Sequence, residues 1–153
     1  MKYRFVIGFS LITLILILAA CGSSTTSSNS KQSQTTPSGS QTVRVTLSDT
    51  RVDSSLTTFT AGMPYHFVVT NTGQVAHQFV MIPMGMGMEH MSSDEMHHAA
   101  LYMYDNVAPG ETRMFDYSFA SSTAGQSLAF VCGTQGHYAA GMQLPFMVNP
   151  HGS

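Results

Sequence analysis

Short segments in which hydrophobic and polar residues alternate recur between residues 41 and 149. A period of two is typical of strands that turn one face to a core and the other to solvent. In residues 112–119, for example, Phe115, Tyr117 and Phe119 fall on one face. The segments expected to be strands are residues 42–47, 56–60, 65–70, 77–82, 112–119, 127–132 and 143–148. About seven short strands separated by turn-forming residues predict an all-β sandwich with a single core.

One segment, residues 84–104, interrupts this pattern. Ser92, followed three residues later by Glu95, forms a capping box, which marks the start of a helix. Met96, Ala100 and Met103 then recur at helical spacing. We therefore expect a short helix within a long flap between two strands.

The first twenty residues have the pattern of a signal peptide. Lys2 and Arg4 precede an apolar run, residues 5–20, that is too short and wrongly flanked for a good transmembrane helix. The run ends in small residues before Cys21 and Gly22, which resembles the lipobox of bacterial lipoproteins. The resemblance implies cleavage before Cys21 and lipidation of that residue. Ordinary secretory cleavage and an uncleaved anchor are the alternatives.

Residues 22–40 consist mainly of Ser, Thr, Gln, Gly and Asn, which cannot form an apolar core. With Cys21 they are expected to form a lipidated, flexible linker over residues 21–40, which holds the domain roughly 25 Å from the lipid. Residues 41–149 are expected to be the folded domain, and residues 150–153 a disordered tail.

Charge and cysteine content narrow the possible functions. Beyond the linker only Arg44, Arg51 and Arg113 are basic, so no basic stripe exists and we expect no nucleic-acid binding. Cys132 is the only cysteine after Cys21, so the folded domain has no intramolecular disulfide. A lone cysteine in an exported protein is either buried and inert, a free thiol, or a metal ligand.

Cys132 begins a glycine-rich segment with the spacing Cys-x4-His-x4-Met, which includes His137 and Met142. His77 lies upstream in the pattern Asn-x-Gly-x3-His. Two imidazoles, a thiolate and a weak axial thioether are the ligand set of a blue-copper electron-transfer site, because they suit both Cu(I) and Cu(II). Taken singly, each of these residues is more often a packing or surface residue. Together, on a β background, they predict a type 1 copper site.

The domain resembles the cupredoxin family over residues 41–149, most specifically in residues 71–79 and 128–148. The spacing of its loop is similar to that of auracyanin, rusticyanin and sulfocyanin, and longer than that of plastocyanin or azurin. The resemblance implies a Greek-key β-sandwich with one copper ion per chain, held at one end by the four residues above. Gln135 and Gln78 depart from the residues common in relatives. Neither position ligates metal, so these departures bear on the redox potential.

The flap contains a second group of candidate ligands. Seven of the twelve methionines lie between Met81 and Met103, together with three histidines. Thioethers are soft ligands, which makes the flap a candidate for an additional, labile Cu(I) site. Packing of methionine into an irregular gap is the alternative. The candidate ligands are Met84, Met86, Met88, His90, Met91, Met96, His97 and His98.

The position of the flap can be predicted from the strand before it. His77 is expected to begin its strand at the copper end, and the strand then runs about 20 Å to Pro83. We therefore expect the flap to start at the far end or side, separate from the type 1 site unless it folds back.

These observations favour a lipid-anchored, extracytoplasmic and monomeric carrier of single electrons, with extracytoplasmic or membrane-bound redox proteins as partners. The alternative is an extracytoplasmic copper-binding protein for resistance, storage or delivery that uses the flap. A third interpretation is an enzyme in which Cys132 is the nucleophile and His137 the base. Because these side chains, five residues apart on one loop, converge more naturally on a metal, we expect no enzymatic activity. His66 is expected on the surface, and His151 has no assigned role.

Overall fold

The computed structural model describes residues 39–152. The expected signal peptide, Cys21 and most of the expected linker lie outside the described residues, as does Ser153. The lipidation and tethering of the chain therefore stay predictions. No helix within residues 39–152 is long and apolar enough to cross a membrane.

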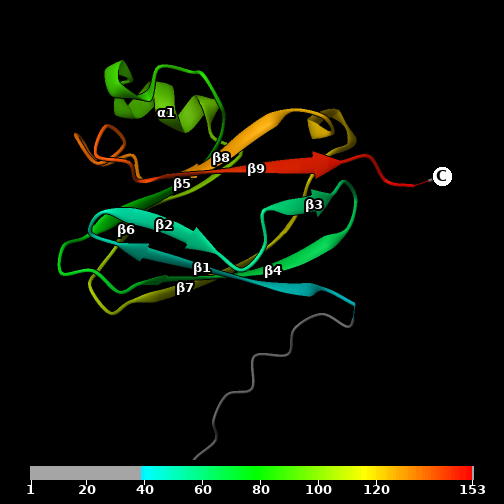
Figure 1. The fold of residues 1–153 in the computed structure, drawn as a ribbon, viewed down its shortest axis with the longest axis horizontal. Coiled ribbons are helices and arrows are strands. Elements are labelled where there is room, and N and C mark those ends of the chain that lie inside the picture. Colours follow the sequence, from blue (N-terminus) through cyan, green and yellow to red (C-terminus); the bar gives the residue numbers. More distant parts are fainter. Residues whose placement is uncertain (1–38, 153) are drawn as a thin grey trace, which may run out of the picture. The chain divides into compact units, whose positions relative to one another are not determined.

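Two β-sheets face each other in this domain (Figure 1). The first contains, in spatial order, β2 (Arg51–Ser54), β1 (Gln41–Ser48), β4 (Pro64–Asn71) and β7 (Thr112–Ser118). The second contains β3 (Thr58–Thr60), β9 (Gln143–Asn149), β8 (Ser127–Val131), β5 (His77–Pro83) and β6 (Tyr102–Val107). Paired strands are antiparallel except β1 with β4 and β3 with β9. The chain passes between the sheets after β2, β3, β4, β6 and β7, as in Greek-key sandwiches.

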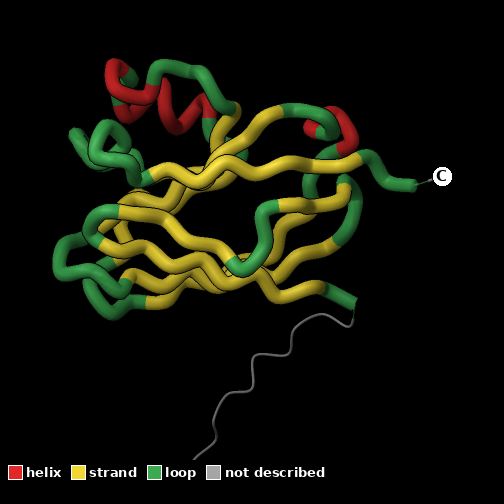
Figure 2. Tube along the Cα trace, in the orientation of Figure 1, coloured by secondary structure: helices red, strands yellow, loops and turns green. Residues whose placement is uncertain are grey.

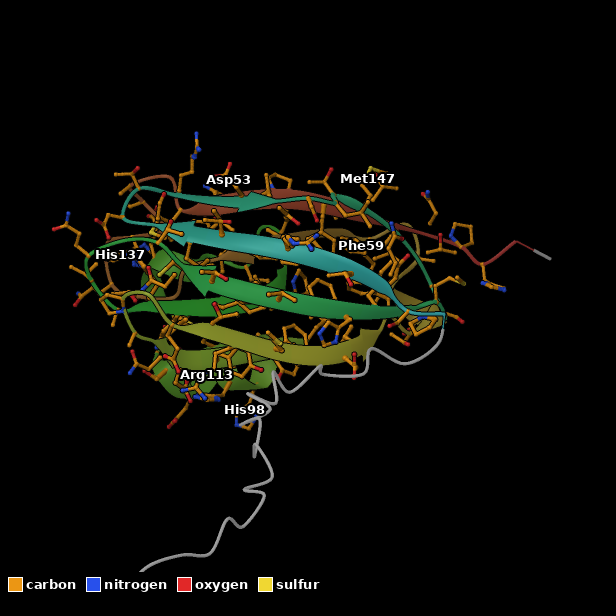
Figure 3. The ribbon with its side chains drawn as sticks, turned by 90° about the horizontal axis from the view of Figure 1, so that it is seen from below. Asp53, Phe59, His98, Arg113, His137 and Met147 are labelled. Carbon is orange, nitrogen blue, oxygen red and sulfur yellow. The ribbon has the colours of Figure 1, made fainter. Side chains whose placement is uncertain are left out.

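The core between the sheets is largely aromatic. Phe59 lies at its centre, with the ring centroids of five other aromatic residues 5.0–6.0 Å away. Phe59 itself is 1% exposed, and its position is labelled in Figure 3. The alternation read from the sequence is confirmed on β7, where Phe115 is buried and Tyr117 half-buried, and just beyond it, where Phe119 is buried.

Two neighbouring strands, β5 and β8, are buried on both faces. Every residue from Phe79 to Ile82 is buried, and so is every residue from Leu128 to Val131. One face packs on the sandwich core, while the outer face, with Val80, packs against Met88 and Met96 of the flap. Cover on both sides explains why these strands are unbroken apolar runs in the sequence.

The flap contains the short 3-10 helix η1 (Met88–His90) and α1 (Ser93–Ala99), which lie outside the second sheet (Figure 2). The predicted capping box is present: Ser92 Oγ accepts the Glu95 N–H at 3.3 Å, and the Glu95 carboxylate accepts the Ser92 N–H at 2.8 Å.

The sequence prediction missed two strands, so residues 39–152 form nine strands rather than about seven. Met103 was expected on the helix, but α1 ends at Ala99 and Met103 pairs with Val80 as part of β6. β6 is an edge strand, where pairing with β5 overrides the local helical spacing. The other missed strand, β2, is also at an edge and has only four residues, of which Val52 alone is buried.

Candidate metal centre

The topology brings His77 and Cys132 to the same end of the second sheet. His77 is the first residue of β5, and Cys132 directly follows β8. Because these adjacent strands are antiparallel, the start of one lies beside the end of the other. The loop from Cys132 to Met142 therefore covers this end, and it is the orange segment in Figure 1.

Backbone hydrogen bonds hold this loop in shape. The Cys132 N–H donates to the Met142 carbonyl at 3.0 Å, and the Met142 N–H donates to the His137 carbonyl at 3.0 Å. The His137 N–H in turn donates to the Thr134 carbonyl at 3.0 Å. The three loop residues predicted as ligands are thus tied to one another through the main chain.

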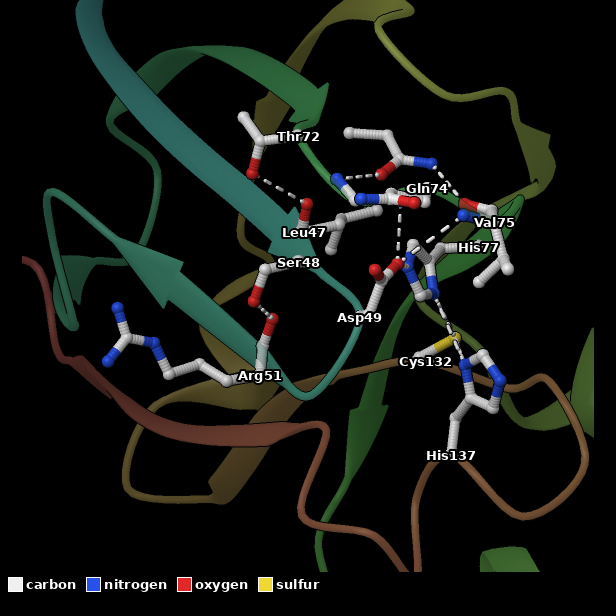
Figure 4. A network of polar contacts seen from close by, with 12 residues as sticks. Leu47, Ser48, Asp49, Arg51, Thr72, Gln74, Val75, His77, Cys132 and His137 are labelled. Atoms are coloured by element: carbon white, nitrogen blue, oxygen red, sulfur yellow. Dashed lines mark hydrogen bonds and ion pairs between the residues drawn. The ribbon is translucent and has the colours of Figure 1, made fainter.

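Side chains of three predicted ligands converge on one point (Figure 4). Sγ of Cys132 lies 3.7 Å from Nδ1 of His77 and 3.5 Å from Nδ1 of His137, and the two Nδ1 atoms are 3.2 Å apart. The centre of this triangle is about 2.0 Å from each corner, close to the length of a bond from a metal ion to imidazole. The donor atoms therefore fit one metal ion without movement of the loop.

The surroundings of the triangle match a type 1 copper site rather than a structural thiol. Cys132 and Met142 are completely buried in the same core cluster, and His77 is 1% exposed, while His137 is half-buried. Two imidazoles and one thiolate in a trigonal array, with a buried methionine in the same loop, are the donor set of a type 1 copper ion. The residues fit one such ion per chain.

Asp49 orients the buried imidazole of His77 from the side away from the triangle. It lies in the two-residue turn between β1 and β2, and its Oδ1 is 3.3 Å from Nε2 of His77. Oδ1 also accepts the Gln74 N–H at 2.8 Å, which holds the pKa of the Asp49 carboxyl below its usual value. Burial lowers the pKa of His77, although Asp49 opposes this shift. His77 is thus kept neutral and oriented, as metal binding requires.

Asn71 braces the turn that leads to His77. Its completely buried side chain donates to the carbonyls of Val75 and Val107, both at 2.8 Å, and accepts the Gly73 N–H at 2.8 Å. These bonds connect the turn to the end of β6.

The flap folds back to the end of the sandwich that carries the predicted copper ligands. The sequence left this possibility open. Met88, Met91 and Met96 line a groove of about 920 Å³ together with Cys132 and Gly133. A Cβ on residue 133 would collide with Met96 Sδ and Gln78 Oε1, so a larger residue there would displace these two side chains beside Cys132. Gln78 Oε1 is buried and has no hydrogen-bond partner among the described residues. The flap therefore starts at the end of β5 opposite His77, as expected, and folds back beside the type 1 ligands, the case that the prediction had left open.

The eight candidate flap ligands do not form one cluster. Met88 and Met96 are buried and pack on the sheet, and Nε2 of His97 lies 3.0 Å from Oδ1 of Asp105. Four of the others line a second, smaller cavity: Met86, His90, Met91 and His98. Met84 is exposed and lines neither cavity.

Two residues that are not among the four predicted type 1 ligands have structural roles beside those ligands. Asp49 was missed because it contacts His77 across 28 positions of sequence, and no local motif marks it. Met96, one of the candidate flap ligands, packs beside Gly133, in line with the packing alternative. His66, half-buried on β4, pairs with Asp116 at 2.7 Å, and His151 is exposed.

No family model matches the sequence, and a comparison with curated proteins finds no significant relative. Solved structures do match the fold. One is a reduced auracyanin from the photosynthetic bacterium Roseiflexus castenholzii, with a TM-score of 0.57 and 19% identity over 73% of this chain and 99% of that chain. Another is auracyanin B, with a TM-score of 0.55 and 20% identity over 72% and 89%. An azurin from the methylotroph Methylomonas sp. strain J has a TM-score of 0.51 and 13% identity over 74% and 99%. At these identities the likeness concerns the fold.

Proposed function

We propose that this protein, which has the cupredoxin fold and the ligand set of a type 1 copper site, carries single electrons between extracytoplasmic redox proteins. The observation that carries the proposal is the convergence of His77, Cys132 and His137, with all three donor atoms within 4.8 Å of one another. A copper ion held by these residues and Met142 supplies a one-electron couple.

The chain contributes a rigid set of donor atoms. Main-chain bonds tie Cys132 and His137 to Met142, and Asp49 fixes His77 through its second ring nitrogen. Residues locked in this way keep one geometry in both oxidation states, which favours rapid electron transfer.

His137 provides the accessible edge of the site. His77 and Cys132 are buried, whereas His137 is half-buried at one end of the sandwich (Figure 3). A redox partner can therefore approach the donor atoms most closely at His137. Sγ of Cys132 is inaccessible to a substrate, and the proposal gives this residue no catalytic part.

The proposal includes a lipid anchor at Cys21 and a flexible linker, which together keep a monomeric domain outside the cytoplasmic membrane. Its support is the apolar segment before Cys21 and the composition of residues 22–40. Replacement of Cys21 by Ser should move the protein from the membrane fraction to the soluble fraction. An unchanged membrane fraction would contradict the anchor without affecting the copper site.

A second candidate function is copper binding for resistance, storage or delivery, which the cavity lined by methionine and histidine favours. Voltammetry of the copper-loaded chain separates the two functions. An electron carrier gives a reversible one-electron wave and keeps its copper through repeated cycles. Release of copper on reduction would contradict electron transfer and support delivery.

A further inference from the structure

The exposure of its methionines divides the flap into a packing part and a part that packing does not explain. Met88 and Met96 are 7% and 5% exposed and pack on the outer face of the second sheet. Met84 and Met86 are each 41% exposed, and Met91 is half-buried. Met91 packs partly against the same outer cluster, whereas Met84 and Met86 belong to neither core cluster.

Met86 and Met91 share a cavity of about 570 Å³ with two histidines, His90 and His98. Glu95 also lines this cavity. Met84 does not, although it is as exposed as Met86 and only two residues away. Only two methionines of the flap, Met86 and Met91, therefore line this cavity.

Local structure explains why these four residues line one cavity. Gly87 has a φ of 60°, and the turn it starts is closed by hydrogen bonds from the His90 N–H to Gly87 and from the Met91 N–H to Met88. This tight turn places Met86 and Met91 at its two ends. His98 lies three residues after Glu95, so both are on one side of α1.

The chemistry of the cavity suits a soft, monovalent cation. Thioethers and neutral imidazoles bind Cu(I) well, whereas hard divalent cations prefer oxygen. The hydrogen bonds from Ser92 hold the pKa of Glu95 below its usual value, so a negative charge stays at the edge of the cavity. Residues 84–99 contain no Lys or Arg that would repel a cation.

We propose that Met86, His90, Met91 and His98 bind one Cu(I) ion between η1 and α1, in addition to the ion of the type 1 site. His90 and Met91 also line the larger groove that reaches Cys132 and Gly133, so the two cavities share a wall. The added site thus lies at the outer side of a groove that leads to the type 1 ligands. It does not depend on the electron-transfer function.

The first test counts Cu(I) in the full chain. The type 1 site is saturated with copper and kept reduced without oxygen, and further Cu(I) is added in competition with bicinchoninate. The wild-type chain should take up one additional equivalent, which the Met86→Leu/Met91→Leu variant should lose. Leucine has a similar volume but no thioether.

Matched controls keep this result specific. Met84→Leu removes an equally exposed thioether from the same segment, and Met114→Leu removes one, 42% exposed, from β7. Both should retain the additional equivalent. The proposal is wrong if the wild-type chain takes up no Cu(I) beyond the type 1 site, or if the double variant takes up as much as the controls. Blue colour on reoxidation reports separately on the type 1 site.

A second test uses only the wild-type protein and therefore does not depend on whether a variant folds. In wild-type protein with ¹³C-labelled methionine methyl groups, the additional Cu(I) equivalent should shift the signals of Met86 and Met91. The signals of Met84 and Met114 should stay in place. Binding that leaves the Met86 and Met91 signals unchanged would place the ion elsewhere and overturn the proposal.

Discussion

Nε2 of the buried His77 lies 3.3 Å from Oδ1 of Asp49, in the turn between β1 and β2. The carboxylate places a negative charge beside an imidazole whose other nitrogen faces Cys132. It therefore stabilises the more positively charged, oxidised state of a metal held there.

Asp49→Asn should raise the reduction potential of the copper-loaded protein, because it removes this negative charge. The shift should be modest, since the Asp49 side chain is 43% exposed and water screens its charge. Asp53→Asn is a matched control: Asp53 is also half-exposed but pairs with Arg51 and does not contact His77. A lower potential for Asp49→Asn, or equal shifts for both variants, would contradict this role.

Asn71→Ala should lower the free energy of unfolding of the metal-free protein by about 1–3 kcal/mol, because it leaves buried backbone groups of Val75, Val107 and Gly73 without partners. Denaturant unfolding followed by fluorescence measures this change. Asn106→Ala, at an exposed position of β6, should stay within about 0.5 kcal/mol of wild type. Equal free energies of unfolding for the two variants would show that the hydrogen bonds of the Asn71 side chain contribute little to stability.

Gly133→Ala should shift the blue absorption band and destabilise the copper-loaded protein by about 1–3 kcal/mol, because the added methyl group collides with Gln78 and Met96 beside Cys132. A second change, Met96→Ala, should restore part of the original spectrum by removing one of the two contacts. Gly152→Ala is the control, since no atom lies within 4 Å of its Cβ position. An unchanged band in Gly133→Ala would mean that the flap does not constrain the loop.

Ser92→Ala should weaken α1 by about 1 kcal/mol through loss of its N-cap. Hydrogen exchange of the amides of residues 93–99 measures this effect, with Ser93→Ala as a control that keeps the cap.

The pKa of Glu95 is below its usual value, chiefly because of the Ser92 N–H, so its stabilising effect is present above pH 4.5 and lost as the pH falls through the lowered pKa. Acidification below pH 4.5 should therefore reduce the protection of α1 and narrow the difference between wild type and Ser92→Ala. A difference that widens on acidification would contradict the capping box.

The sequence predicted the parts of the site that are local. Cys132, His137 and Met142 lie on one loop, so their spacing alone indicates a shared ligand set, and the capping box at Ser92 is equally local. The alternation of apolar residues predicted the sandwich because most strands have one buried and one exposed face. These features depend on residues that are close in sequence.

Contacts between distant segments could not be predicted in this way. Asp49 reaches His77 through the packing of two turns, and Met96 reaches Gly133 because the flap folds back. Met103 has helical spacing to Met96, yet pairing of β6 with β5 decides its conformation. Tertiary packing determines each of these contacts, and it cannot be predicted from the local sequence pattern.

The central claim is that His77, Cys132, His137 and Met142 form a type 1 copper site. Titration of the metal-free protein with Cu(II), followed by visible absorption, tests it most directly. We predict an intense blue or green band that saturates at one equivalent and is absent in Cys132→Ser. A protein that takes up copper without this band, or a band that persists in Cys132→Ser, would contradict the assignment.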